Sequence, residues 1–274
     1  DMSRAERLAW SGATREWAAR AQASFAGSRA DLARLPPSPP AHDAMSDRLR
    51  TAIESALLRL RESLDAGDRI TSAYLALADA VERNQMDRVN SIRVTAIEAA
   101  LVSTRLFQDT NAAQAAASME GNPQGPLAGA YAHSYEALWA ILFYRRELIS
   151  GGEPDRQATA EALTSAARRM REEIAQGRRD LALFNAQLND PAIAASIDPA
   201  LLPRLRALGA TFPASFVREE EVAGDFEAIA RLLNGPSGGD PMEAQIDVHL
   251  DAFSQRDTRR IDDIQQRTAI MTAP

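Results

Sequence analysis

The sequence has no cysteine, no lysine, and few histidines and aromatic residues. Without cysteine the chain can form neither a disulfide framework nor a thiolate zinc site, and it has no cysteine nucleophile. All 31 basic residues are arginines, which excludes a phosphate-binding loop that ends in Gly-Lys. The three histidines offer few general bases, and no Gly-x-Ser-x-Gly segment occurs. We therefore predict a protein that is not an enzyme and that carries no cofactor and no metal.

Long apolar runs and an excess of positive charge are also missing. No stretch of about 18 apolar residues is present, so these residues are not expected to insert into a membrane. The formal net charge is -7 and the isoelectric point is near 5.2, which argues against nucleic acid as a partner. The chain begins with Asp1 rather than Met, so it is either processed or truncated or carries one extra residue before Met2, and the removal of a signal peptide or an anchoring helix would leave no trace in these residues. The expected location is periplasmic or extracytoplasmic in a bacterium, with a cytoplasmic location as the alternative.

What the sequence does contain is a helical pattern. Hydrophobic residues make up 45% of the chain, many of them alanines, whereas aromatic residues make up 5%. This composition favours helix over strand. Between residues 154 and 189, apolar or small residues recur at alternating spacings of four and three, which is typical of the buried seam of a bundle helix. These positions are Leu163, Ala167, Met170, Ile174, Gly177, Leu181, Phe184 and Leu188.

A second seam of this kind is predicted in the C-terminal segment, where it is interrupted by one polar residue, Asp257. Its positions are Ile246, Leu250, Phe253, Asp257, Ile261, Ile264, Thr268 and Met271. A helix of about thirty residues is roughly 45 Å long, which is typical of an elongated bundle.

Further helices are predicted over residues 3–34, from Leu49 to Gly67, from Asp68 to Val81, and over 87–117, with Gly67 as a stop signal and Asp68 as a cap. Glycine- and proline-containing breaks are expected at 35–40, 119–126, 149–155, 191–203 and 234–241.

Together these patterns predict an all-α protein built as an elongated antiparallel helical bundle. The helices form either two modules, residues 1–118 and 127–274, or one continuous bundle. The segment SRADLARL (28–35) resembles GRRDLALF (177–184), and ALLRLR (56–61) resembles ALLPRLR (200–206), which suggests duplicated helical modules. The biased content of arginine, alanine and leucine is the alternative explanation.

The segment YAHSYEALWAILFYRREL (131–148) places His133 and Glu136 one helical turn apart. The pair is either a metal or acid–base site or one side of a helix, and on a helix it points away from the apolar stripe. The motif is similar to one carried by the imelysin-type helical proteins, which place a glycine two residues before the histidine, where this chain has Tyr131. A metal site in a bundle needs further inward-pointing carboxylates or histidines, and the sequence offers no second copy of the motif.

A pocket for an apolar or aromatic ligand is the other candidate site. Trp10, Trp17, Trp139 and Tyr144 are its predicted aromatic residues, with core packing as the alternative role. Gly177 interrupts the predicted seam, and a glycine weakens a helix by about 1 kcal/mol relative to alanine. We expect close helix approach, a kink or a pocket at this position. The predicted ligand-binding residues are therefore Trp10, Trp17, His133, Glu136, Trp139, Tyr144 and Gly177.

Three functions are compatible with this sequence. The first is a non-catalytic helical binding, sensory or adaptor module, expected to be the extracytoplasmic part of a membrane-tethered bacterial protein, with a protein partner or a small apolar ligand. The second is a cytoplasmic oligomeric scaffold, with a homodimer as one assembly, that works through an exposed apolar stripe. The third is a metal-binding helical protein that uses His133 and Glu136.

Overall fold

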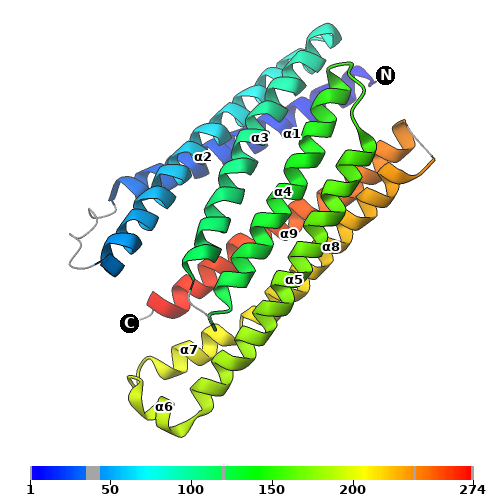
Figure 1. Ribbon diagram of the computed structural model, residues 1–274. Helices are drawn as coiled ribbons and strands as arrows, with labels where there is room; N and C mark the ends of the chain where they lie inside the picture. The colour runs from blue at the N-terminus through cyan, green and yellow to red at the C-terminus, as the bar shows by residue number, and fades with distance from the viewer. Residues whose placement is uncertain (1, 35–43, 119–120, 237–238, 273–274) are drawn as a thin grey trace. The chain divides into compact units, whose positions relative to one another are not determined.

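The computed structural model describes residues 2–34, 44–118, 121–236 and 239–272, and within these ranges the chain is helical and contains no strand. The prediction of an all-α helical bundle is thereby confirmed (Figure 1). The helices are α1 (Arg4–Arg34), α2 (Ala44–Glu82), α3 (Met86–Ala117), α4 (Gln124–Ile149), α5 (Arg156–Asn189), α6 (Pro191–Ser196), α7 (Leu202–Gly209), α8 (Phe212–Asn234) and α9 (Asp240–Thr272).

The chain folds into two compact units that are not contiguous in sequence. Unit 1 comprises Asp1–Thr110 and Leu138–Asp155, and unit 2 comprises Asn111–Ala137 and Arg156–Pro274. Helix α4 is continuous, yet its first half belongs to unit 2 and its second half to unit 1. This division differs from the contiguous modules 1–118 and 127–274, because a boundary inside a helix leaves no glycine or proline signal in the sequence.

In unit 1, α1 packs along α2. Helix α2 runs without interruption through Gly67, so the predicted stop at this residue is wrong. Gly67 is buried, and a Cβ atom placed on it would lie 2.7 Å from Cζ of Phe25 on α1. The glycine therefore allows the Phe25 ring to approach the α2 backbone. Asp68, predicted as a cap, instead pairs with Arg29 at 2.6 Å.

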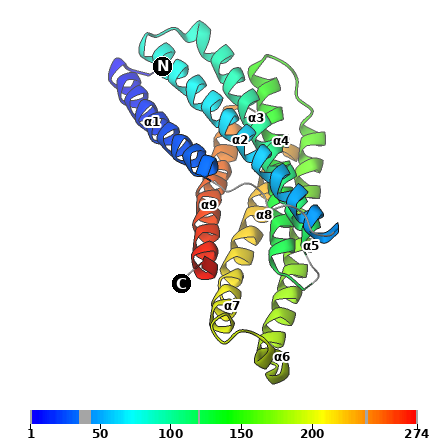
Figure 2. The same ribbon diagram turned by 90° about the vertical axis from the view of Figure 1, so that its left-hand side faces the viewer.

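In unit 2, α5 packs against α8, and α8 against α9, while α6 and α7 lie at the end of the α5–α8 pair (Figure 2). The predicted seam of α5 is confirmed, since seven of its eight positions are buried and Phe184 is half-buried. Leu127 and Tyr131 of α4 and Phe212 and Phe216 of α8 complete the core on this side.

The predicted apolar seam of α9 is correct only in its first half. Ile246 and Phe253 are buried, whereas Ile261 and Ile264 are 55% and 49% exposed. The seam prediction is therefore wrong beyond Asp257. The buried positions there are two arginines, Arg260 and Arg267, and their partners are described below.

The connections follow the predicted breaks where the structure describes them. The segment 149–155 separates α4 from α5, and 191–203 contains the short helix α6 and the first two residues of α7. The proline-rich segment 35–40 and His42 lie outside the described residues. Residues 56–61 lie inside the long helix α2, whereas 202–206 lie in the eight-residue helix α7. The duplication stays a prediction.

Candidate functional site

A cavity inside unit 1 is the strongest candidate for a binding site. Its volume is about 370 Å³, which falls within the range of about 300–1,000 Å³ that is typical of small-molecule sites. Helices α1, α2, α3 and α4 all contribute to its lining, which includes Trp10, Tyr74, Arg93, Ala96, Ala100 and Arg145. It is named the Trp10 cavity below.

Helical periodicity places the α3 part of this lining on one face. Arg93, Ala96, Ile97 and Ala100 follow one another at spacings of three, one and three residues, so they share a single stripe of the helix. The two alanines have short side chains and leave space that larger residues would fill. The α4 residues of the lining, at 142, 145 and 149, are spaced in the same way.

Two aromatic side chains form part of the wall. Trp10 of α1 is half-buried. Tyr74 of α2 also lines the cavity and contacts Trp17 edge to face, with ring centroids 5.2 Å apart. Tyr74 was not among the predicted site residues, although it occupies the apolar stripe of its helix with Ile70 and Leu77.

The other predicted aromatic residues do not line this cavity. Trp17 is 42% exposed and lies against Tyr74. Trp139 is 37% exposed and stacks on Phe143 at a centroid distance of 5.3 Å. Tyr144 is buried in unit 1. Helical spacing indicates which residues share a face, but not which faces meet, and the structure brings only Trp10 of these four to the cavity.

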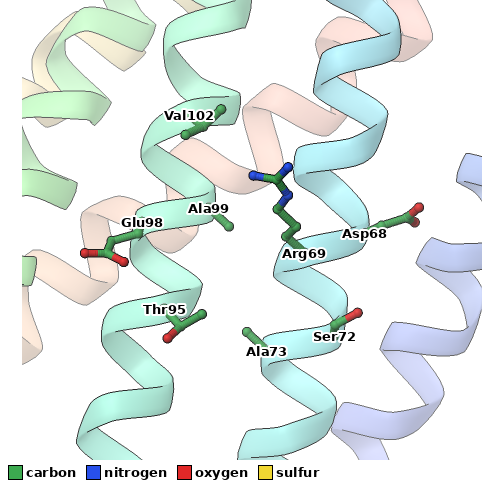
Figure 3. Close-up of a pocket in the computed structure, with 8 residues that line it drawn as sticks. All are labelled: Asp68, Arg69, Ser72, Ala73, Thr95, Glu98, Ala99 and Val102. Atoms are coloured by element: carbon green, nitrogen blue, oxygen red, sulfur yellow. The ribbon is translucent and has the colours of Figure 1, made fainter.

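A groove of about 620 Å³ lies between α2 and α3 (Figure 3). Its carboxylates point away from one another in this view: Asp68 pairs with Arg29, and Glu98 pairs with Arg146 at 3.2 Å. Arg69 projects between the two helices (Figure 3), and no ion-pair partner for it is present in the described ranges. The lining of this groove therefore contains both acidic and basic groups, whereas the charged residues in the lining of the Trp10 cavity are arginines only.

His133 and Glu136 are joined by a hydrogen bond in unit 2. Nδ1 of His133 lies 3.2 Å from Oε2 of Glu136, and Nη2 of Arg169 donates to Oε1 of Glu136 at 2.6 Å. The hydrogen bond from His133 and that from Arg169 together hold the pKa of Glu136 below its ordinary value, against the opposing effect of burial. Among the described residues, no group of three or more His, Cys, Asp or Glu side chains is placed to hold a metal ion. Both carboxylate oxygens of Glu136 are thus occupied by protein donors.

His133 also lines a cleft of about 620 Å³ in unit 2, together with Glu173 and Asp180. Glu173 lies over Gly129, where a Cβ atom would come within 2.7 Å of the carboxyl carbon. Burial raises the pKa of Glu173, and the described residues provide it with no hydrogen-bond or ion-pair partner. The lining of this cleft is acidic.

At Gly177 the core of unit 2 packs closely against α5. A Cβ atom on this residue would lie 2.5 Å from Cε1 and 2.6 Å from Cζ of Phe216. Of the three explanations that the sequence allowed, the structure supports close helix approach. Gly177 is therefore a packing residue in this structure and does not line the cavities described here.

The buried arginines of α9 belong to an ionic network in unit 2 that sequence reasoning missed. Arg260 and Glu219 have side chains that are 3% and 0% exposed, and the guanidinium donates to both carboxylate oxygens, with Nε 2.9 Å from Oε1. Arg260 also donates to Asp257, which accepts a hydrogen bond from Tyr135 at 2.8 Å. Burial alone would lower the pKa of Arg260, but Glu219 raises it well above the ordinary value, so the guanidinium keeps its proton.

Arg267 continues this network by donating to Thr211 at 3.0 Å and to Ser215. Burial raises the pKa of Tyr131 to about 12. The Tyr131 hydroxyl and Nη1 of Arg267 are buried and have no hydrogen-bond partner in the described part of the chain. A cavity of about 420 Å³ has Arg267 in its lining. Because Arg267 already donates hydrogen bonds to the hydroxyl groups of Thr211 and Ser215, we interpret it as a residue that stabilises the fold and not as a ligand-binding residue.

In comparisons with protein-family models, curated proteins and solved structures, nothing matched this chain. None of the described helices is both long enough and apolar enough to cross a membrane.

Proposed function

We propose that this protein is a non-catalytic helical binding module and that the Trp10 cavity holds its ligand, a small and largely apolar molecule. The observation that supports the proposal is the composition of the cavity, in which four helices place Trp10 and Tyr74 among aliphatic side chains. A concave, mostly apolar site with a few polar groups is the usual form of a small-molecule site.

The chemistry of the lining favours binding over acid–base catalysis. Its charged groups are the guanidinium groups of Arg93 and Arg145. Arginine keeps its proton at physiological pH, so it can orient and neutralise an acceptor but cannot take up a proton as a general base.

The proposal is tested with N-phenyl-1-naphthylamine, a neutral aromatic probe whose fluorescence rises in apolar surroundings. Titration of the purified protein should show saturable binding of one probe per chain. The variant Ala100→Phe fills the cavity and should weaken binding by about tenfold or more, which corresponds to about 1.4 kcal/mol. Ala23→Phe is the matched control, because Ala23 is exposed on α1 and the same side chain is added outside the cavity.

Equal binding by wild type and Ala100→Phe would refute the Trp10 cavity as the site, as would an absence of binding to the wild type. Circular dichroism and thermal unfolding of both variants separate loss of the site from loss of the fold.

An oligomeric scaffold is a second candidate, supported by the exposure of Ile261 and Ile264 on consecutive turns of α9. Light scattering of wild type and of the double variant Ile261→Asp, Ile264→Asp tests it. A concentration-dependent dimer that the double variant abolishes would favour the scaffold, and a monomer at all concentrations would exclude it. The extracytoplasmic location and the sensory role stay predictions, which fractionation of cells that express the full-length gene would test.

A further inference from the structure

We infer that the ligand of the Trp10 cavity carries a negative charge, so that it is an amphipathic anion with an apolar or aromatic body. The inference rests on the proposed function and specifies its ligand class. Two arginines, Arg93 and Arg145, line the cavity together with aromatic and aliphatic groups, and no aspartate or glutamate is among its lining residues.

Arg93 is the residue that carries the inference. It lies on the same stripe of α3 as Ala96, Ile97 and Ala100, which places its side chain at the cavity. Arg93 is exposed, and the described residues offer it no ion-pair or hydrogen-bond partner. Most arginines whose contacts are given above have a carboxylate partner, such as Arg29 with Asp68 and Arg146 with Glu98.

The physical chemistry of the cavity favours an anion. A ligand whose apolar body fills the cavity would displace water from the exposed guanidinium of Arg93, and an anionic group on that ligand would replace the lost interactions with charge-assisted hydrogen bonds. The planar fork of arginine fits the oxygens of a carboxylate, sulfonate or phosphate group. Trp10 and Tyr74 supply the surface against which an apolar or aromatic body would pack.

Two of the other three hollows described above have carboxylates in their lining. The groove between α2 and α3 includes Asp68 and Glu98 in its lining, and the cleft beside His133 includes Glu173 and Asp180. Carboxylates there would repel an anion. An arginine lining without carboxylates is therefore not common to every depression on this acidic protein. The cavity that contains Arg267 shares it, but Arg267 already donates hydrogen bonds to Thr211 and Ser215.

A pair of probes with one difference tests the inference. 8-Anilinonaphthalene-1-sulfonate has the ring system of N-phenyl-1-naphthylamine with a sulfonate added. We expect the sulfonate probe to bind the wild type more tightly than the neutral probe, with one site per chain. Arg93→Gln should weaken the sulfonate probe by about tenfold, the effect of losing one charge-assisted hydrogen bond. The affinity of the neutral probe should stay within about twofold, because its contacts are with the apolar walls.

Arg88→Gln is the matched control, since it removes the same charge from an exposed position of α3 outside the cavity lining. It should leave both affinities unchanged. Ala100→Phe should weaken both probes, which distinguishes the cavity from adventitious surface binding.

The possible results separate the inference from the proposed function. If both probes bind equally well, or if Arg93→Gln affects them equally, the ligand class is wrong while the binding site stands. If neither probe binds, both the ligand class and the proposed function are refuted. Because Arg93 is exposed, its replacement should leave the thermal unfolding midpoint unchanged, and a shifted midpoint would contradict its assignment to ligand binding.

Discussion

Replacing Gly177 by alanine adds one carbon atom at a crowded point of unit 2. That Cβ would lie 2.5 Å from Cε1 of Phe216, whereas carbon atoms pack favourably at about 3.5–4.0 Å. The Phe216 ring must therefore retreat by about 1 Å. The ring is 1% exposed and packs in the same core cluster as Phe212, so the retreat disturbs its neighbours.

The expected change in stability is the difference between two effects. Overpacking a core costs about 1–3 kcal/mol. Alanine in place of glycine in a helix gains about 1 kcal/mol. Gly177→Ala should therefore lower the free energy of unfolding by about 0–2 kcal/mol. Gly177→Leu should lower it further, because a branched side chain cannot fit where one carbon already clashes.

Gly224 provides the matched control. It lies inside α8, and a Cβ atom added there meets no neighbouring atom of the described residues within 4 Å. Gly224→Ala should therefore show the helical gain alone and stabilise the protein by about 1 kcal/mol. The difference between the two variants isolates the packing cost at Gly177, because the change in helix propensity is common to both.

The measurement is urea unfolding followed by circular dichroism, with the midpoint and slope fitted for each variant. If Gly177→Ala and Gly224→Ala stabilise the protein equally, the close contact between α5 and α8 is incorrect. In a protein that already carries Phe216→Leu, Gly177→Ala should lower the free energy of unfolding by less than it does in the wild type. Additive effects of the two replacements would argue against direct contact.

Three further predictions concern charged groups in unit 2. Glu219→Leu removes the buried carboxylate that accepts two hydrogen bonds from Arg260, leaves Asp257 as the remaining carboxylate partner, and should destabilise the protein by about 3–5 kcal/mol in chemical unfolding. The double replacement with Arg260→Met should recover most of that loss, and equal losses for the single and double variants would contradict a buried pair. Glu173→Gln should raise the unfolding midpoint at pH 7 but not at pH 4. Burial raises the pKa of Glu173, so ionisation of this carboxyl group at neutral pH opposes folding, and glutamine removes that cost. An equal change in the midpoint at both pH values would refute this reasoning. Burial alone would raise the pKa of Asp263, but hydrogen bonds from Arg218 and Ser215 hold it below the ordinary value. The ionised Asp263 carboxylate therefore stabilises the folded protein fully above a pH of about 4, and this contribution is lost as the pH falls through the folded-state pKa. Asp263→Asn should make the free energy of unfolding less dependent on pH below about 4. An unchanged acid-unfolding transition would exclude a contribution of Asp263 to acid stability.

The sequence alone determined the all-α class and most of the helices, because hydrophobic periodicity is a local property. The spacing of Leu163, Met170 and Ile174 was sufficient to identify the buried face of α5, and the structure confirms it. Gly177 also stood out from the sequence, since a glycine inside a regular seam conflicts with helix propensity. The partner of that glycine, Phe216, is in another helix and was not predictable.

The tertiary structure decided which residues of α9 are buried where charged side chains occupy the positions that helical spacing directs to the core. Beyond Asp257 hydrophobicity favours Ile261 and Ile264 as buried positions, although regular heptad spacing from Phe253 leads to Arg260 and Arg267. A buried arginine is stable only with a partner such as Glu219, which lies 41 residues away in sequence. Local patterns carry no information about such a pairing. For the same reason the Trp10 cavity required the structure: each helix indicated its own face, but only the packing of four helices brought Trp10, Tyr74 and Arg93 to one space.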